Sequence, residues 1–263
     1  MKIVDTHCHL DFDSYDKDLN EVIDRAKREG VKAFVIPGAD PADLPRAVEI
    51  SQRYKEVFFA VGVHPYDADN YEEEYLKKYI EHPKCVAVGE CGLDYYRLPK
   101  DDREKERIKK RQKEVFIAQI DLAKRYKKPL IVHIREASAD SLEILKEHAD
   151  PTYGGVLHCY NASEILLELA YMGFYYGIGG VLTFKNAKKL LKVVPKIPID
   201  KIVLETDSPF LTPHPYRGKR NEPAYTALVA SKLSQILDKD LDSICEITTK
   251  NAARLFRPLE KIV

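Results

Sequence analysis

The sequence predicts an α/β protein that folds as a single (β/α)8 TIM barrel with an extra C-terminal helix. Eight short apolar runs rich in β-branched residues occur along the chain, and longer amphipathic, charged segments alternate with them. A strand buried on both faces of a parallel sheet is almost continuously apolar, and such strands alternate with helices in barrels. A chain of 263 residues is long enough for one barrel. We therefore expect residues 1–263 to form one domain.

The expected strands are the apolar runs themselves, at residues 2–5, 33–37, 57–63, 85–89, 130–133, 155–158, 174–178 and 201–205. The expected helices carry apolar residues at helical spacing. These stripes lie at residues 19–26, 44–50, 115–123 (within a longer helix at 103–126), 142–145, 166–169, 190–194 and 228–237. A last helix at 241–256 should pack outside the barrel. An open doubly wound sheet is the alternative, but it gives no reason for eight units.

Composition excludes some classes of protein. Lys plus Arg and Asp plus Glu are both 42, so the formal net charge is zero. This argues against a protein that coats duplex DNA by neutralising many phosphates, but it allows an enzyme that binds a few phosphates in a pocket. No apolar run is long enough to span a membrane. The five cysteines are scattered and the N-terminus becomes polar at Asp5, so we expect a cytoplasmic protein without a signal peptide.

Candidate metal ligands stand at the C-terminal ends of the expected strands, where (β/α)8 enzymes carry their active sites. His7 and His9 follow the first strand and point to the same side of an extended chain. The other strand ends supply Glu90, His133, His158, Glu205 and Asp207. One histidine alone could be structural, but this conjunction predicts a metal site. The set suits two divalent ions with Glu90 between them, and the sequence leaves Mg, Mn, Zn, Fe and Ni open.

The motifs around these residues resemble those of the TatD-related metal-dependent deoxyribonucleases, within the amidohydrolase superfamily. The matching segments, in the family's order, are IVDTHCHLD at 3–11, VGVHP at 61–65, VGECGLDY at 88–95, PLIVHIREASAD at 129–140 and LETDSPFLTP at 204–213. The resemblance implies a TIM barrel with a two-metal centre. It implies that one ion is held by His7, His9, Glu90 and Asp207, and the other by Glu90, His133 and His158.

The resemblance also implies a hydrolase that cleaves phosphodiester bonds of DNA, and the favoured hypothesis is a 3′-end exonuclease that acts on single strands. Two metal ions would activate a water for attack on phosphorus. Asp207 would orient that water and take its proton, and Glu205 would orient a ligand imidazole. His64, at the end of the third strand, would contact a phosphate oxygen or the leaving group. Two alternatives remain: an amide or ester hydrolase, such as a D-aminoacyl-tRNA deacylase, and a non-catalytic, metal-stabilised scaffold.

Basic and aromatic residues near the strand ends are candidates for binding single-stranded nucleic acid. Arg135 lies two residues beyond His133, and Tyr95 and Arg97 follow Glu90. The loop after the last strand adds Arg217, Lys219 and Arg220. A salt bridge of Arg135 to a nearby acid, or a solvated charged loop, would explain the same residues without a ligand. We expect a DNA substrate as the partner, with no obligate protein partner.

Overall fold

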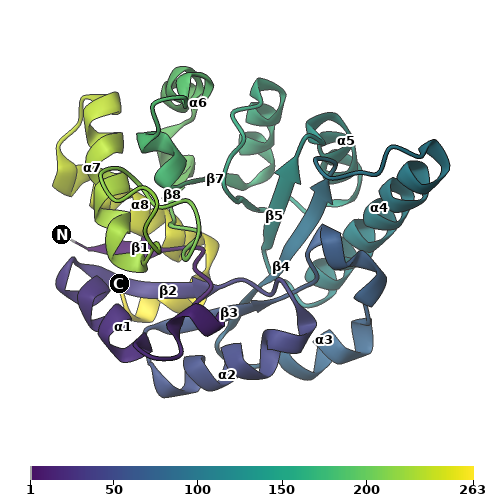
Figure 1. The fold of residues 1–263 in the computed structure, drawn as a ribbon, viewed down its shortest axis with the longest axis horizontal. Helices are drawn as coiled ribbons and strands as arrows, with labels where there is room; N and C mark the ends of the chain where they lie inside the picture. The colour runs from purple at the N-terminus through teal and green to yellow at the C-terminus, as the bar shows by residue number, and fades with distance from the viewer. Residues whose placement is uncertain (1) are drawn as a thin grey trace.

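Eight parallel strands form one sheet in the order β1 to β8 in the computed structural model, which describes residues 2–263 (Figure 1). The strands are β1 (Ile3–Asp5), β2 (Val31–Ile36), β3 (Val57–Val61), β4 (Cys85–Asp94), β5 (Leu130–Arg135), β6 (Gly155–Leu157), β7 (Phe174–Ile178) and β8 (Ile202–Leu204). The backbone N–H of Thr6 donates to the carbonyl of Leu204 at 3.0 Å, and Cys8 bridges to Ser208 in parallel. These contacts link β1 to β8, so the predicted barrel is confirmed.

Helices surround the strands, and nine short 3-10 helices lie among the connections of the described residues. They are α1 (Leu19–Arg28), α2 (Leu44–Arg53), α3 (Glu73–Ile80), α4 (Asp102–Arg125), α5 (Ser138–His148), α6 (Lys188–Val193), α7 (Thr226–Leu237) and α8 (Leu241–Leu255). The expected C-terminal helix is therefore present. The stripe at 166–169 lies in a 3-10 helix, Glu164–Met172. No apolar stripe was predicted for α3, because this helix buries only Leu76 and Ile80.

The buried side chains form two layers. One layer lies within the barrel and includes Val4, Val35 and Val203, together with Phe256 and Leu259 from beyond α8. The other fills the space between the strands and the surrounding helices. Alternating side chains of each strand supply the two layers, as the pleat requires.

The C-terminal helix α8 covers the end of the barrel at which the strands begin. Thr249 donates a hydrogen bond to the carbonyl of Lys2, just before β1, at 2.8 Å. Asn251 donates to the carbonyl of Ile202, the first residue of β8, at 2.8 Å. The opposite end, where the strands finish, is therefore left for the polar residues. No helix within residues 2–263 is both long and apolar enough to cross a membrane.

Strand β4 is longer than its apolar run. The run ends at Gly89, but β4 continues to Asp94 and pairs with β5 as far as Arg135. Glu90 and Asp94 therefore both lie within β4, which has a register shift between Val88 and Cys91, and both are buried. The prediction that the strand ends at Gly89 was wrong, because pairing with β5 extends it through residues of mixed polarity.

Candidate metal centre

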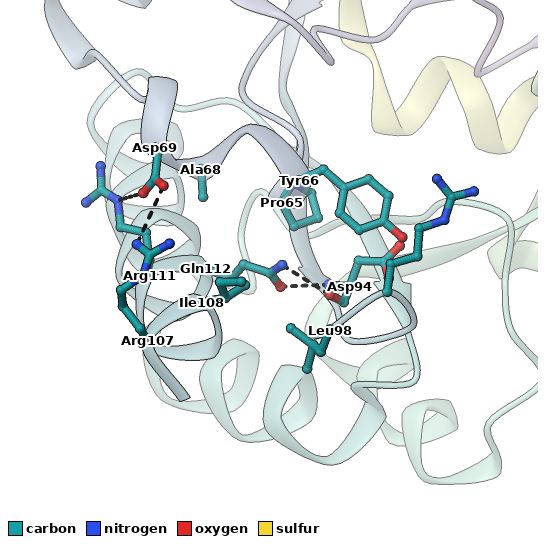
Figure 2. A pocket seen from close by; sticks show the side chains of 11 residues that line it. Pro65, Tyr66, Ala68, Asp69, Asp94, Leu98, Arg107, Ile108, Arg111 and Gln112 are labelled. Carbon is teal, nitrogen blue, oxygen red and sulfur yellow. Dashed lines mark hydrogen bonds and ion pairs between the residues drawn. The ribbon is translucent and has the colours of Figure 1, made fainter. Parts of the chain in front are cut away.

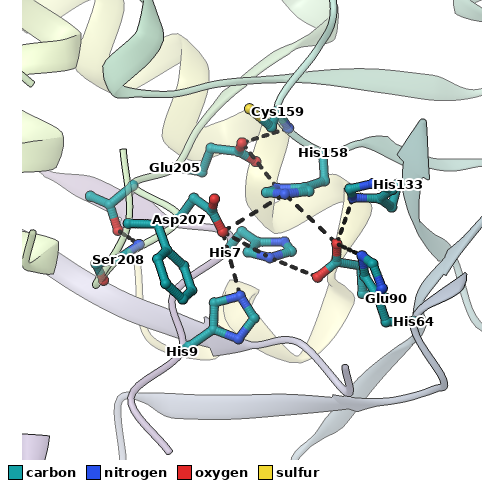
Figure 3. A network of polar contacts seen from close by, with 12 residues as sticks. His7, His9, His64, Glu90, His133, His158, Cys159, Glu205, Asp207 and Ser208 are labelled. Carbon is teal, nitrogen blue, oxygen red and sulfur yellow. Dashed lines mark hydrogen bonds and ion pairs between the residues drawn. The ribbon is translucent and has the colours of Figure 1, made fainter. Parts of the chain in front are cut away.

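Four imidazoles and two carboxylates from five strand ends meet at the C-terminal end of the barrel (Figure 3). They are the six predicted metal ligands: His7, His9, Glu90, His133, His158 and Asp207. His7, His9, Glu90 and His158 are almost fully buried. His133 and Asp207 keep side-chain exposures of 18 % and 15 %, so these two form the open side of the cluster.

Glu90 lies between two sets of imidazoles, and each of its oxygens faces a different set. Its Oε2 lies 3.2 Å from Nε2 of His7. Its Oε1 lies 2.9 Å from Nδ1 of His133 and 3.9 Å from Nε2 of His158. A carboxylate with its two oxygens turned to different nitrogen donors has the geometry of a bridge between two cations.

Asp207 closes the other side of the cluster. Its Oδ1 lies 3.4 Å from Nε2 of His9, 3.6 Å from Nε2 of His7 and 3.8 Å from Nε2 of His158. The rings of His7 and His158 stack at 3.5 Å between their centroids. The nitrogens of three histidines therefore converge on one carboxylate oxygen.

The electrostatics of the cluster favour ionised carboxylates. Burial raises the pKa of Glu90, but His158 and His7 outweigh it and hold the pKa well below its usual value. Burial also raises the pKa of Asp207, but the charge of His158 and the hydrogen bond from His9 outweigh this effect and lower the pKa. Burial would lower the pKa of His158, but Glu205, Glu90 and Asp207 raise it to about 10. The two carboxylates therefore favour positive charge in their vicinity, from protonated imidazoles or bound cations.

The donor set fits divalent metal ions. Both ring nitrogens of His7 and Nδ1 of His9 are buried and make no hydrogen bond within residues 2–263. Buried polar atoms normally have a hydrogen-bond partner, so these unpaired nitrogens are available to bind a ligand such as a metal ion. Among the groups whose ligand atoms lie within 4.8 Å of one another are His7–His9–Asp207 and Glu90–His133–His158. The second group has the residues that the resemblance implies for one ion, and the first contains three of the four residues that it implies for the other. Nitrogen together with oxygen donors suits Zn, Mn, Fe or Ni.

Glu205 contacts His158 on the side away from Glu90 (Figure 3). Its Oε1 lies 3.1 Å from Nδ1 of His158 and accepts a hydrogen bond from the backbone N–H of Cys159 at 2.7 Å. Glu205 is only 1 % exposed. The Nδ1 of His158 therefore faces a carboxylate, and Nε2 remains for the centre.

His64 lies at the edge of the cluster. Its Nδ1 accepts a hydrogen bond from the backbone N–H of Tyr66 at 3.1 Å, so the ring proton sits on Nε2. That nitrogen lies 3.6 Å from Oε1 of Glu90. Burial lowers the pKa of His64 to about 4. The side chain is thus a neutral imidazole that turns an N–H donor toward the centre.

Asp94 belongs to the site, although the sequence analysis did not identify it. Its Oδ2 lies 2.8 Å from Nε2 of His133, and Oδ1 accepts a hydrogen bond from the backbone N–H of Tyr96 at 2.9 Å. An N–H at Nε2 that donates to Asp94 leaves the lone pair of Nδ1 facing Glu90. Had β4 been predicted to extend past Glu90, the alternation of side chains would have identified Asp94, because it lies four residues after Glu90 and therefore on the same side of the strand.

Helix α4 holds Asp94 in place through a buried glutamine. The side chain of Gln112 accepts a hydrogen bond from the backbone N–H of Asp94 at 2.9 Å and donates to its carbonyl at 3.1 Å (Figure 2). A cavity of about 320 Å³ adjoins this contact and is lined by Arg107 and Arg111. Both arginines pair with Asp69, so their charge is already compensated.

Three of the predicted substrate-binding residues lie at or just after the ends of β4 and β5, and of these Arg135 lines a cavity that also contains His133 and Asp207. Arg135 stacks on the ring of Tyr96, with 3.6 Å from its guanidinium carbon to the ring centroid. Arg97 lies 5.8 Å from the ring centroid of Tyr66. The hydroxyl of Tyr95 donates to Asp140 at 2.7 Å.

The other three predicted substrate-binding residues make contacts within the protein. Arg220 donates to Asp18 through two nitrogens, at 2.8 and 2.6 Å. Arg217 donates to the carbonyl of Thr212 at 2.9 Å and lies over a phenylalanine ring. Lys219 lies 5.8 Å from the ring centroid of Tyr216. The basic side chains of this loop are therefore already engaged in contacts with other residues of the protein.

Comparison with known proteins places this site in a family. A sequence model for TatD related DNase matches residues 4–257. The uncharacterized metal-dependent hydrolase YabD of Bacillus subtilis is 46 % identical over 97 % of this chain and 99 % of its own. The crystal structure of YjjV, a TatD homologue from Escherichia coli K12, superposes with a TM-score of 0.88 at 30 % identity, over 97 % and 98 % of the two chains. A TatD-family hydrolase from Entamoeba histolytica gives a TM-score of 0.83 at 25 % identity, over 98 % and 99 %.

Proposed function

Since the chain belongs to the TatD-related DNase family of metal-dependent hydrolases, we propose that it hydrolyses phosphodiester bonds of DNA with two divalent ions. The substrate proposed is a single strand cut from its 3′ end. The observation that carries the proposal is the position of Glu90, whose two oxygens face His7 and His133 at 3.2 and 2.9 Å. A recessed centre, with most of its side chains buried, favours a chain end over the middle of a duplex.

In this proposal, different residues of the cluster have different roles. His7, His9, Glu90 and Asp207 would hold one ion, and Glu90, His133 and His158 would hold the other. Such a pair of ions would lower the pKa of water and stabilise negative charge on the reacting oxygens. Asp207 orients the attacking water and accepts its proton at the carboxylate. Its side chain is the ionised and partly exposed carboxylate of the cluster, which suits that role.

His64 acts on the substrate rather than on the ions. Its Nδ1 is occupied by the backbone of Tyr66, so only the Nε2–H can be offered. A neutral imidazole with one N–H donor can donate a hydrogen bond to a non-bridging phosphate oxygen or to the departing 3′ oxygen.

The test is cleavage of an end-labelled single-stranded oligonucleotide by the metal-loaded protein, with Mg²⁺, Mn²⁺ and Zn²⁺ in separate reactions. A 5′ label should give a ladder of products that shorten with time, whereas a 3′ label should give mononucleotide at once. The reverse pattern would contradict the 3′ polarity. Asp207→Asn should abolish cleavage while Asp242→Asn, far from the centre on α8, leaves it unchanged.

Two further outcomes decide the other parts of the proposal. Metal analysis of the loaded protein should find about two ions per chain, and saturation at a single ion would contradict the two-metal centre. A protein that releases D-amino acid from aminoacyl-tRNA, yet leaves every DNA substrate intact with all three metals, would be an ester hydrolase and not a nuclease.

A further inference from the structure

The metal centre opens into two adjoining cavities that share His133, His158, Asp207 and Phe210. We name them by the charge of their other walls. The acidic cavity, of about 440 Å³, is lined in addition by Asp40, Asp43 and Asp67. The cationic cavity, of about 490 Å³, is lined in addition by Arg135 and Lys189. A substrate at the shared residues therefore meets opposite charges on its two sides.

The acidic cavity is unfavourable for a polyanion. Asp40, Asp43 and Asp67 follow strands β2 and β3, and none of them has an ion pair within residues 2–263. Three carboxylates without an ion pair on one wall repel the phosphates of a strand, because like charges at close range raise the free energy of the complex. A continuous strand is therefore not expected to leave the centre by this side.

The cationic cavity has the opposite character. Arg135 lies at the end of β5 and Lys189 in the first turn of α6, and neither pairs with a carboxylate in the part of the chain that the structure describes. This separates them from Arg107, Arg111 and Arg220, whose charge is compensated by Asp69 or Asp18. An unpaired cation on a cavity wall is free to bind an anionic ligand.

The remaining walls of the cationic cavity are apolar. They are formed by Val181, Leu190, Leu211 and the ring of Phe210, which is 49 % exposed. The ring centroid of Phe210 lies 5.5 Å from that of Phe12 and 6.0 Å from that of His9. Phe210 therefore stands at the border between the centre and the cavity. An exposed aromatic ring beside an unpaired cation is the combination that binds an unpaired base together with its phosphate.

We infer that the cationic cavity is a subsite for the nucleotide next to the scissile bond, with its phosphate at Arg135 and Lys189 and its base against Phe210. The strand then continues past β5 and α6, away from the acidic cavity. This inference rests on the proposed function in that it names where the DNA strand lies. It assigns Lys189 to substrate binding, a role that its place in the sequence does not suggest.

The chain offers a matched pair of variants for the test. Lys189 and Lys188 are adjacent, both exposed and both in the first turn of α6, but only Lys189 lines the cavity. The experiment compares Lys189→Gln with Lys188→Gln in the metal-loaded protein. Binding of a fluorescent, phosphorothioate-linked single strand is followed by anisotropy over a range of salt concentrations. Hydrolysis of bis(4-nitrophenyl) phosphate, which has no adjoining nucleotide, is measured in parallel.

Lys189→Gln should weaken binding of the strand about tenfold at low salt, and reduce the slope of log affinity against log salt by about 0.7, as expected for one lost phosphate contact on a single strand. Lys188→Gln should leave both quantities unchanged. Lys188→Gln should also hydrolyse the small diester like the wild type. Equal strand affinities for the two variants would overturn the subsite, whatever the hydrolysis shows. If the wild type hydrolyses neither the small diester nor DNA, the proposed function fails separately.

The base contact has its own readout. A strand with an abasic sugar at the adjoining nucleotide should bind the wild type about tenfold more weakly, because a stacked base is lost while the phosphate stays. The Lys189→Gln variant should show the same loss on top of its own. Equal affinity for the abasic and the complete strand would exclude the base from the cavity.

Discussion

At the scale of single residues, the partners of the imidazoles decide which nitrogen each histidine turns to the centre. Glu205 faces Nδ1 of His158, and Asp94 faces Nε2 of His133. A carboxylate that accepts from one ring nitrogen fixes the tautomer and makes the other nitrogen a better ligand. These two acids therefore prepare the site without being placed in either proposed ligand group.

We expect Glu205→Gln to lower metal affinity about 10–100-fold, because His158 loses the charge that orients and polarises its ring. Titration of the metal-free protein with Zn²⁺ or Mn²⁺ measures this loss. Glu81→Gln, at an exposed position after α3, is the matched control and should bind metal like the wild type. An unchanged affinity in Glu205→Gln would show that His158 needs no such partner.

Substitutions of Asp94 should lower metal affinity by graded amounts. Asp94→Asn keeps an oxygen that can accept from Nε2 of His133, whereas Asp94→Ala leaves that buried N–H without a partner. Metal affinity should therefore fall in the order wild type, Asn, Ala, with the Ala variant weaker by about 10–100-fold. If Asn and Ala lose equal affinity, the charge of Asp94, and not its hydrogen bond, is what His133 requires.

At the scale of elements, helix α4 supports the site from behind through two buried glutamines. Gln119 accepts from the backbone N–H of Val63 at 2.8 Å and donates to its carbonyl at 3.0 Å, just before His64. Gln112 makes the same pair of bonds with Asp94. The two glutamines are seven residues apart, about two turns, so they share one face of the helix. Helix α4 thus completes the backbone bonding of Val63, just after β3, and of Asp94, the last residue of β4.

The variant Gln119→Met should lower the free energy of unfolding by about 2 kcal/mol, because it leaves the buried N–H and C=O of Val63 without partners. Chemical denaturation measures this change. Gln235→Met, at an exposed position on α7, should be neutral. Metal affinity should stay at the wild-type value in both, since neither residue contacts a metal-binding side chain; a loss in Gln119→Met alone would mean that α4 also sets the ligand geometry.

At the scale of the whole molecule, stability and chemistry occupy opposite ends of the barrel. Helix α8 and the residues after it cover the end where the strands begin, with Phe256 and Leu259 fully buried. The six candidate metal ligands all lie at the other end, where the strands finish. Changes at the covered end should therefore affect folding without altering the chemistry of folded molecules.

Phe256→Ala should reduce the free energy of unfolding by about 3–5 kcal/mol, as expected for a cavity left by a buried aromatic ring. Denaturant unfolding measures the loss, and metal stoichiometry per folded molecule should stay the same. Truncation of Tyr171, which is 92 % exposed, to alanine is the control and should change neither quantity. A lowered metal stoichiometry in folded Phe256→Ala would contradict the separation of the two ends.

Much of the centre could be predicted from the sequence, because strand order and side-chain alternation are local patterns. Eight apolar runs predict the barrel, and a barrel brings the ends of β1, β4, β5, β6 and β8 together whatever the rest of the chain does. The six candidate ligands could be identified because they stand at these predicted strand ends. Asp94 could not be identified in this way, because the position at which β4 ends depends on its pairing with β5 rather than on its own hydrophobicity.

The sequence by itself thus determined the barrel, the family and the residue types at its open end. Only the tertiary structure decided which charges are already paired. Arg220 is bound by Asp18, 202 residues away, whereas Lys189 on the wall of the cationic cavity has no such partner in the described chain. Local periodicity specifies on which side of an element a residue lies, but the pairing of charges depends on contacts between elements that are distant in sequence.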